Sequence, residues 1–107
     1  MEKFAKSFPS KPLSWPRSKK WALAGVVGSG NLEVLFEPNT KSPDKMECHV
    51  ESSIPGYKDS WLAALEDFAS NYSVGGVKVG IHDQGADPIV VTLRLRQAYD
   101  HLIQKTP

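Results

Sequence analysis

The chain has 107 residues and a mass of 11.8 kDa, the size of one domain. It is 40% hydrophobic and 23% charged, which excludes a wholly disordered chain and a collagen-like polymer. The formal net charge of +1 conceals an asymmetry, because residues 1–20 carry a net charge of +5 and the remainder a net charge of −4.

Residues 1–20 are expected to form a flexible basic arm that precedes a folded domain over residues 21–107. Pro9, Pro12 and Pro16 interrupt regular structure in this segment, and lysine and serine fill the intervals. The segment has no apolar run like the core of a signal peptide, and no later apolar run reaches the length of a membrane span. We therefore expect no membrane partner.

The folded domain is expected to open with a β-hairpin. Trp21–Val27 and Leu32–Glu37 are predicted strands, and the glycines between them supply the backbone conformations that a tight turn requires. Ser29 lies between Gly28 and Gly30 at the predicted tip. By composition alone this is an ordinary turn. A serine held at the end of a stiff stalk, with no base beside it, suits a hydroxyl that carries a group better than a catalytic one.

The remaining elements are predicted by periodicity. Met46–Ser52 alternates as a strand, expected to pair antiparallel with the second strand of the hairpin. Asp59–Tyr72 has helical spacing, with Asp59 or Ser60 as the N-cap, and Val77–Asp83 alternates as a strand. Residues 88–104 are predicted to be a helix, since Asp87 precedes a proline at its first position.

The predicted fold class is therefore α+β: a small antiparallel sheet in the order β-β-β-α-β-α, with two helices packed on one face. Trp61, Phe68 and Tyr72 are expected in the core. The single cysteine, Cys48, is expected to be a buried strand residue, and a lone cysteine is typical of a reducing, cytoplasmic compartment.

No catalytic or metal site is expected. The three histidines, His49, His82 and His101, lie in no recognisable motif, and His49 and Cys48 face opposite ways on a strand. His82 and Asp83 suggest either a proton relay or anion contact, or a strand end whose aspartate bonds the following turn. Arg94 and Arg96 do not share a helical face, which argues against a joint phosphate clamp.

Two blocks of sequence resemble one known family. Ala24–Pro38, and Ile81–Pro88 followed by Val90–Ala98, are similar to the signatures of the acyl carrier (delta) subunit of malonate decarboxylase. The similarity extends over residues 21–104. The acyl carrier (gamma) subunit of citrate lyase is a more distant relative with the same kind of serine.

This resemblance implies a non-catalytic carrier. The family's serine, matched by Ser29 between Gly28 and Gly30, bears 2'-(5''-phosphoribosyl)-3'-dephospho-CoA through a phosphodiester bond. The thiol of this arm carries acetyl and malonyl groups as thioesters. The implied partners are an acyl transferase (alpha) subunit, decarboxylase (beta/gamma) subunits and an enzyme that attaches the prosthetic group. The long tether raises the local concentration of the thioester at each active site.

Two alternatives remain at this point. The chain could be the carrier of citrate lyase or a related lyase, a choice that depends on the partner subunits. It could also be a small binding module whose basic arm, with Trp15 and Trp21 beside it, contacts nucleic acid or an acidic protein. We expect no nucleic-acid partner, because a solvated tail accounts for the same charges.

Overall fold

The computed structural model describes residues 2–15, 20–25, 31–86 and 88–103. Within these residues the chain forms five strands and two helices. The strands are β1 (Glu2–Pro9), β2 (Ala22–Ala24), β3 (Leu32–Pro38), β4 (Lys45–Ser52) and β5 (Val77–Asp83), and the helices are α1 (Lys58–Asn71) and α2 (Pro88–Ile103).

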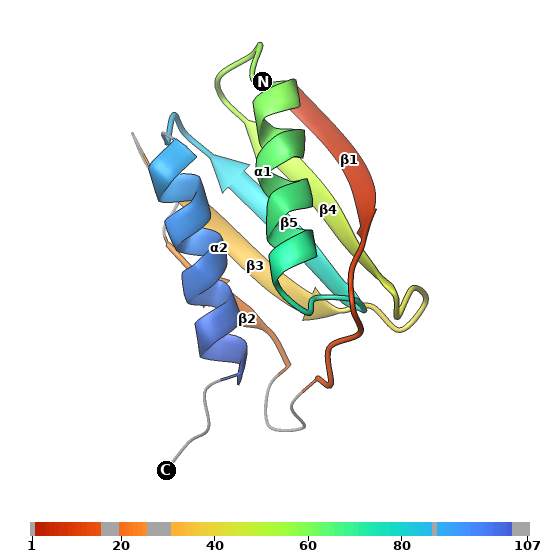
Figure 1. Cartoon of the computed structure of the whole chain (residues 1–107). Coiled ribbons are helices and arrows are strands. Elements are labelled where there is room, and N and C mark those ends of the chain that lie inside the picture. Colours follow the sequence, from red (N-terminus) through yellow and green to blue (C-terminus); the bar gives the residue numbers. More distant parts are fainter. Residues whose placement is uncertain (1, 16–19, 26–30, 87, 104–107) are drawn as a thin grey trace.

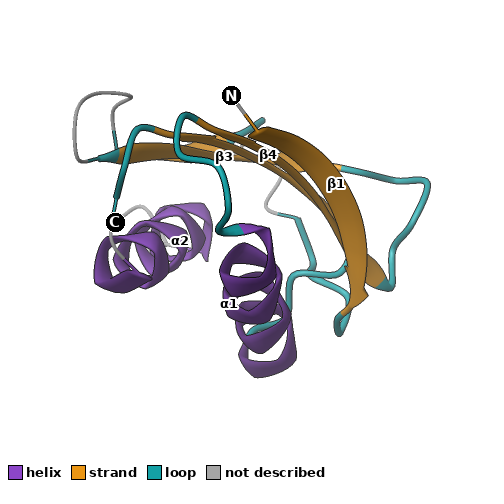
Figure 2. Ribbon diagram, turned by 90° about the horizontal axis from the view of Figure 1, so that it is seen from above, coloured by secondary structure: helices purple, strands orange, loops and turns teal. Residues whose placement is uncertain are grey.

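The strands form one curved sheet, in the spatial order β1-β4-β5-β3-β2, and both helices cover the same face of it (Figure 1, Figure 2). The other face is open in Figure 2. This arrangement confirms the predicted α+β class and the packing of two helices on one face. Over the described residues, no helix is long and apolar enough to cross a membrane.

The core lies between the sheet and the helices, and two periodicities produce it. Every second residue of a strand faces the helices, so Leu32, Val34 and Phe36 of β3 are all fully buried. The helices bury residues spaced three or four apart. These are Trp61, Leu65, Phe68 and Ala69 of α1, and Val91, Leu95, Ala98 and Leu102 of α2.

The position of β4 differs from the sequence prediction. It was expected to pair antiparallel with the second hairpin strand, but it lies between β1 and β5, antiparallel to β1 and parallel to β5. The reason is the connection through α1. A helix that crosses the sheet returns the chain to the end at which it started, so the two flanking strands run in the same direction.

The N-terminal segment also differs from the expected flexible arm. Residues 2–9 form β1, which pairs with all eight residues of β4, from Glu2 opposite Ser52 to Pro9 opposite Lys45. Phe8 is buried, and Lys3 forms an ion pair with Glu51 at 2.9 Å. Proline is tolerated here because β1 is an edge strand and Pro9 is its last residue.

Residues 10–15 are also joined to the fold. The Ser10 hydroxyl lies 2.8 Å from the Ala69 carbonyl oxygen and accepts a 3.0 Å hydrogen bond from the Val74 N–H, so it ties the chain to the end of α1. The Leu13 N–H donates to the Gly75 carbonyl at 2.9 Å. The alternative of a binding module with a free basic arm loses its premise, because residues 2–15 are built into the sheet and its surroundings.

The helix starts test two predicted caps. Helix α1 has Tyr57 as its N-cap residue, with no capping hydrogen bond from its side chain, so the prediction of Asp59 or Ser60 was two or three residues late. Asp59 lies instead in the first turn, where a negative charge favours the helix dipole. Helix α2 begins at Pro88 as predicted, whereas its expected cap, Asp87, lies outside the described residues.

Candidate functional site at the β2–β3 hairpin

The hairpin predicted to present the serine is confirmed, up to its tip. Strands β2 and β3 pair antiparallel, with Ala22 opposite Phe36 and Ala24 opposite Val34. All four side chains are buried, so the hairpin is fixed to the core by its inner face. Gly28, Ser29 and Gly30, the candidate attachment residues, lie outside the described residues.

The chain enters the tip at Gly25, where only glycine fits. Its φ is +80°, a conformation that L-residues avoid. A Cβ at this position would overlap the carbonyl oxygen of Leu32 and would lie 3.0 Å from Cδ of Arg94. The two ends of the hairpin segment therefore approach each other closely, and the side chain of Arg94 lies beside them.

The chain leaves the tip at Asn31, which is held by three contacts. Its Oδ1 accepts hydrogen bonds from the N–H of Leu32 at 2.8 Å and from Nε of Arg94 at 3.3 Å. Its carbonyl oxygen accepts a 2.9 Å bond from the N–H of Gln84, in the turn between β5 and α2. Asn31 thus joins the base of the hairpin tip to both α2 and the turn that precedes it.

Arg94 brings a positive charge to this base. Its side chain is half-buried, and Nη1 donates to Oε1 of Gln97 at 2.7 Å, which fixes its orientation. Arg96 is exposed on another side of α2, in agreement with the prediction that the two arginines do not act together. A role for Arg94 without Arg96 was not predicted from the sequence. The available signal was its spacing of three residues from the buried Val91, which turns it toward the sheet.

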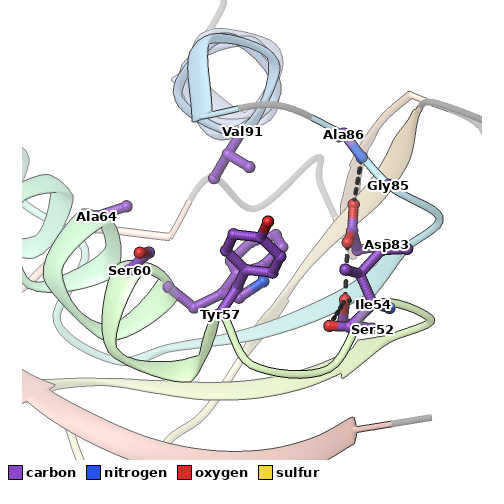
Figure 3. A pocket seen from close by; sticks show the side chains of 10 residues that line it. Ser52, Ile54, Tyr57, Ser60, Ala64, Asp83, Gly85, Ala86 and Val91 are labelled. Atoms are coloured by element: carbon purple, nitrogen blue, oxygen red, sulfur yellow. Dashed lines mark hydrogen bonds between the residues drawn. The ribbon is translucent and has the colours of Figure 1, made fainter.

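A pocket of about 470 Å³ lies between the N-terminal halves of the two helices, and part of its wall is the turn after β5, which also bonds Asn31 (Figure 3). Its walls come from α1, α2 and the segments that follow β4 and β5. Apolar walls predominate, and Tyr57 is 57% exposed, so its ring borders the mouth. The lining residues are Ser52, Ile54, Tyr57, Ser60, Trp61, Ala64, Asp83, Gly85, Ala86 and Val91.

A buried carboxylate forms one wall of this pocket. Asp83 is 5% exposed and Ser52 is 1% exposed. Oδ2 of Asp83 accepts a 2.8 Å hydrogen bond from the Ser52 hydroxyl, and Oδ1 accepts a 2.9 Å bond from the N–H of Ala86, as the dashed lines in Figure 3 show. The bond to Ala86 confirms the interpretation of Asp83 as a strand-end residue that holds the following turn.

The other half of the His82–Asp83 pair faces away from this pocket. His82 is exposed on the open side of the sheet, where its Nε2 lies 2.9 Å from Oε2 of Glu51. A hydrogen bond from Lys3, together with the charges of Lys3 and His82, holds the pKa of Glu51 below its usual value despite some desolvation. His82 and Asp83 therefore do not act together at one site.

The structure also shows where Cys48, His49 and His101 lie. Cys48 is buried and His49 exposed, so they face opposite ways as expected, and burial strongly raises the pKa of the Cys48 thiol. His101, in the last turn of α2, is exposed, and its Nδ1 lies 3.2 Å from the carbonyl oxygen of Leu23. In the described part of the chain, no three His, Cys, Asp or Glu residues gather in a way that could hold a metal ion.

Comparison with known proteins points to one family. Residues 19–102 match the family model described as malonate decarboxylase delta subunit (MdcD). A relative from Xanthomonas campestris pv. campestris strain B100, a malonate decarboxylase acyl carrier protein, is 47% identical over 81 residues, which is 76% of each chain. A protein of the same name from Acinetobacter calcoaceticus is 40% identical over 98 residues, 92% of this chain and 93% of its own length.

A solved structure is similar over nearly the whole chain. It belongs to a Pseudomonas malonate decarboxylase hetero-tetramer, crystallised in complex with malonate. The similar chain superposes with a TM-score of 0.80 at 36% sequence identity, and the match covers 95% of this chain and 99% of that one. A match of this extent leaves out only about 5% of the chain, so it is not confined to the domain expected over residues 21–107.

Proposed function

The chain belongs to the malonate decarboxylase delta subunit family, and from this premise we propose that Ser29 is the residue to which its prosthetic group is attached. The family makes the chain an acyl carrier subunit rather than a catalytic one, and its relatives carry that name. A carrier of this kind implies a covalently bound group. The specific group in the proposal is 2'-(5''-phosphoribosyl)-3'-dephospho-CoA, joined to the Ser29 hydroxyl oxygen by a phosphodiester bond.

The observation that carries this proposal is the anchored base of the hairpin tip. Gly25 and Asn31 bracket a five-residue segment. Asn31 accepts a hydrogen bond from Arg94, and a Cβ at Gly25 would lie 3.0 Å from the Arg94 side chain. A phosphodiester and the phosphates of the arm are anionic, and a guanidinium is well suited to them because it is charged and presents several donors in one plane. The residues at the base therefore fit the group chemically.

The chain's own contribution is to hold and present the tether. When attached, the arm would supply a thiol on which malonate replaces acetate as the thioester, and from which carbon dioxide is then released to regenerate the acetyl form. The hairpin supports the attachment point, Arg94 offsets the phosphate charge, and Cys48 is kept out of the chemistry by burial. Attachment to a single carrier gives each active site a high effective concentration of the thioester.

The proposed partners follow from the same assignment. The similar structure is a hetero-tetramer, which supports other malonate decarboxylase subunits as partners. We assign them as the acyl transferase (alpha) and decarboxylase (beta and gamma) subunits, with a separate attachment enzyme. Malonate rather than citrate is favoured by the names of the relatives. A cytoplasmic location belongs to the same proposal, and the free, buried Cys48 is compatible with it.

The decisive experiment is intact-mass spectrometry of the chain produced together with the attachment enzymes. We expect the wild type and a Ser14→Ala control, which removes an exposed hydroxyl elsewhere, to gain the mass of the arm. Ser29→Ala should remain bare and fail to support malonate decarboxylation in the assembled complex. An adduct on Ser29→Ala, or decarboxylation supported by that variant, would refute the assignment.

A further inference from the structure

The pocket between the N-terminal halves of α1 and α2 has no role in the function described so far. Its lining residues define what it can hold. Its volume of about 470 Å³ is within the usual range of small-molecule sites. Trp61, Ala64 and Val91 supply apolar surface, whereas none of the described residues that line it is a lysine or arginine. The pocket is therefore built for an uncharged, largely apolar group.

The buried Asp83 sharpens this preference. Both of its carboxylate oxygens already accept hydrogen bonds, from Ser52 and from the backbone of Ala86. The carboxylate therefore needs no donor from a ligand, and it offers an incoming anion only repulsion in a partly desolvated space. A second carboxylate in this pocket would have no positive side chain to offset it.

One turn of the chain joins the pocket to the hairpin. Gly85 and Ala86 line the pocket, and the preceding residue, Gln84, donates its N–H to the carbonyl of Asn31. On α2, Val91 lines the pocket and Arg94, one turn later, bonds Asn31. Asn31 is two residues from Ser29 in the sequence, so a tether attached at Ser29 is joined to the chain only two residues from this hydrogen-bonded position.

We propose that this pocket receives the acetylated end of the carrier's own prosthetic tether between transfers, and that it does not receive the malonylated end. The inference rests on the proposed attachment at Ser29. The acetyl thioester is neutral and ends in an apolar methyl group, which suits the lining. The malonyl thioester ends in a carboxylate, which the Asp83 wall disfavours.

A weak intrinsic affinity is enough for such a site. A flexible tether presents its end at an effective concentration on the order of 1 mM when its length matches the distance to the site. A pocket with a Kd of about 0.1 mM would then hold the acetyl end for about nine-tenths of the time. A reagent that attacks only the free end would react about tenfold more slowly. The pocket would in this way protect the resting thioester from water.

The test uses the full chain loaded with the tether, acetylated with a ¹³C-labelled acetyl group, and cleaved with hydroxylamine. The pocket-filling variant is Ala64→Phe, on the α1 wall. Its matched control is Ala63→Phe, the same substitution at the neighbouring exposed residue of the same helix, which does not line the pocket. Loading is measured first by intact mass, and folding of each variant by circular dichroism.

We expect cleavage of the acetyl thioester to be about tenfold faster in Ala64→Phe than in the wild type and in Ala63→Phe. The malonyl form should be cleaved at the same rate in all three. Independently of any variant, the labelled methyl group of the wild type should show a nuclear Overhauser contact with the indole ring of Trp61.

The failures are distinguishable. A loaded wild type without the Trp61 contact, with equal acetyl cleavage rates in the three proteins, overturns the pocket assignment and leaves the attachment intact. A malonyl form protected as strongly as the acetyl form overturns the proposed selectivity. A wild type that gains no tether overturns the attachment at Ser29, and the pocket inference with it.

Discussion

Replacing Gly25 with alanine tests whether the base of the hairpin tip is as tightly closed as the structure describes. A left-handed backbone costs an L-residue about 1–2 kcal/mol, and the reduced freedom of the unfolded chain offsets roughly 0.4–1 kcal/mol of this. At Gly25 a Cβ would also overlap the Leu32 carbonyl oxygen, so backbone must move. We therefore expect Gly25→Ala to lower the free energy of unfolding by about 3 kcal/mol or more.

The chain supplies a matched control in Gly56. Its φ is +92°, close to that of Gly25, but a Cβ there would meet no atom within 4 Å. Gly56→Ala therefore carries the backbone strain without the overlap, and we expect a loss of about 1 kcal/mol or less. The difference between the two variants isolates the energy of the close approach between Gly25 and Leu32.

Thermal unfolding followed by circular dichroism measures both variants. For a domain of this size, 1 kcal/mol corresponds to a change in Tm of about 4–8 °C. The expected decreases are about 5 °C for Gly56→Ala and about 12 °C or more for Gly25→Ala. Equal decreases in the two variants would refute the close approach, and with it the argument that both ends of the tip are held beside Arg94.

Three further outcomes are expected. Arg94→Gln should slow attachment of the tether about tenfold, which corresponds to the loss of one charge-assisted hydrogen bond. Arg96→Gln should leave the attachment rate unchanged, and a mass-spectrometric time course measures both rates. Equal rates in the two variants would remove Arg94 from the site. Cys48 should react with iodoacetamide only after unfolding in urea, because burial raises its pKa, and rapid labelling of the folded chain would contradict this. Lys3→Met should raise the pKa of Glu51 in a carboxyl NMR titration, since Lys3 is the main cause of its depression. Because this pKa is depressed, the Lys3–Glu51 pair stabilises β1 at pH values above the usual glutamate pKa. The stabilisation is lost as the pH falls through the pKa of Glu51 in the folded chain. An unchanged Glu51 pKa in Lys3→Met would exclude the pair.

The periodicity of apolar residues predicted the strands and helices that bury one face and expose the other. Val77–Asp83 alternates strictly, and the observed β5 has the predicted bounds. The helix predicted over residues 88–104 is observed as Pro88–Ile103, and the proline at its first position correctly marked its start. In these cases the local pattern and the tertiary burial agree, so the sequence suffices.

Long-range pairing was not accessible in the same way. Strand β1 contains Lys3 and Lys6, ends in Pro9, and buries Phe8 most completely, so its pattern is too polar to stand out. Its stability comes from β4, whose paired residues lie 36 to 50 positions further along the chain. The contact between Arg94 and Asn31 spans 63 residues. The local helical spacing turns Arg94 toward the sheet, but it does not specify Asn31 as the partner. The resemblance to a family pointed to Ser29, whereas only the fold reveals that Arg94 bonds Asn31, two residues further along the chain.

The two outer strands have a consequence for how the protein behaves in a crowded cell. β1 and β2 are the outermost strands of the sheet, positions that invite edge-to-edge pairing between copies. β2 is only three residues long, and β1 displays Lys3 and Lys6 and ends in a proline, features that discourage such pairing. The short length of β2 and the charges of β1 therefore disfavour the edge-to-edge pairing by which copies of a small subunit would associate into fibres.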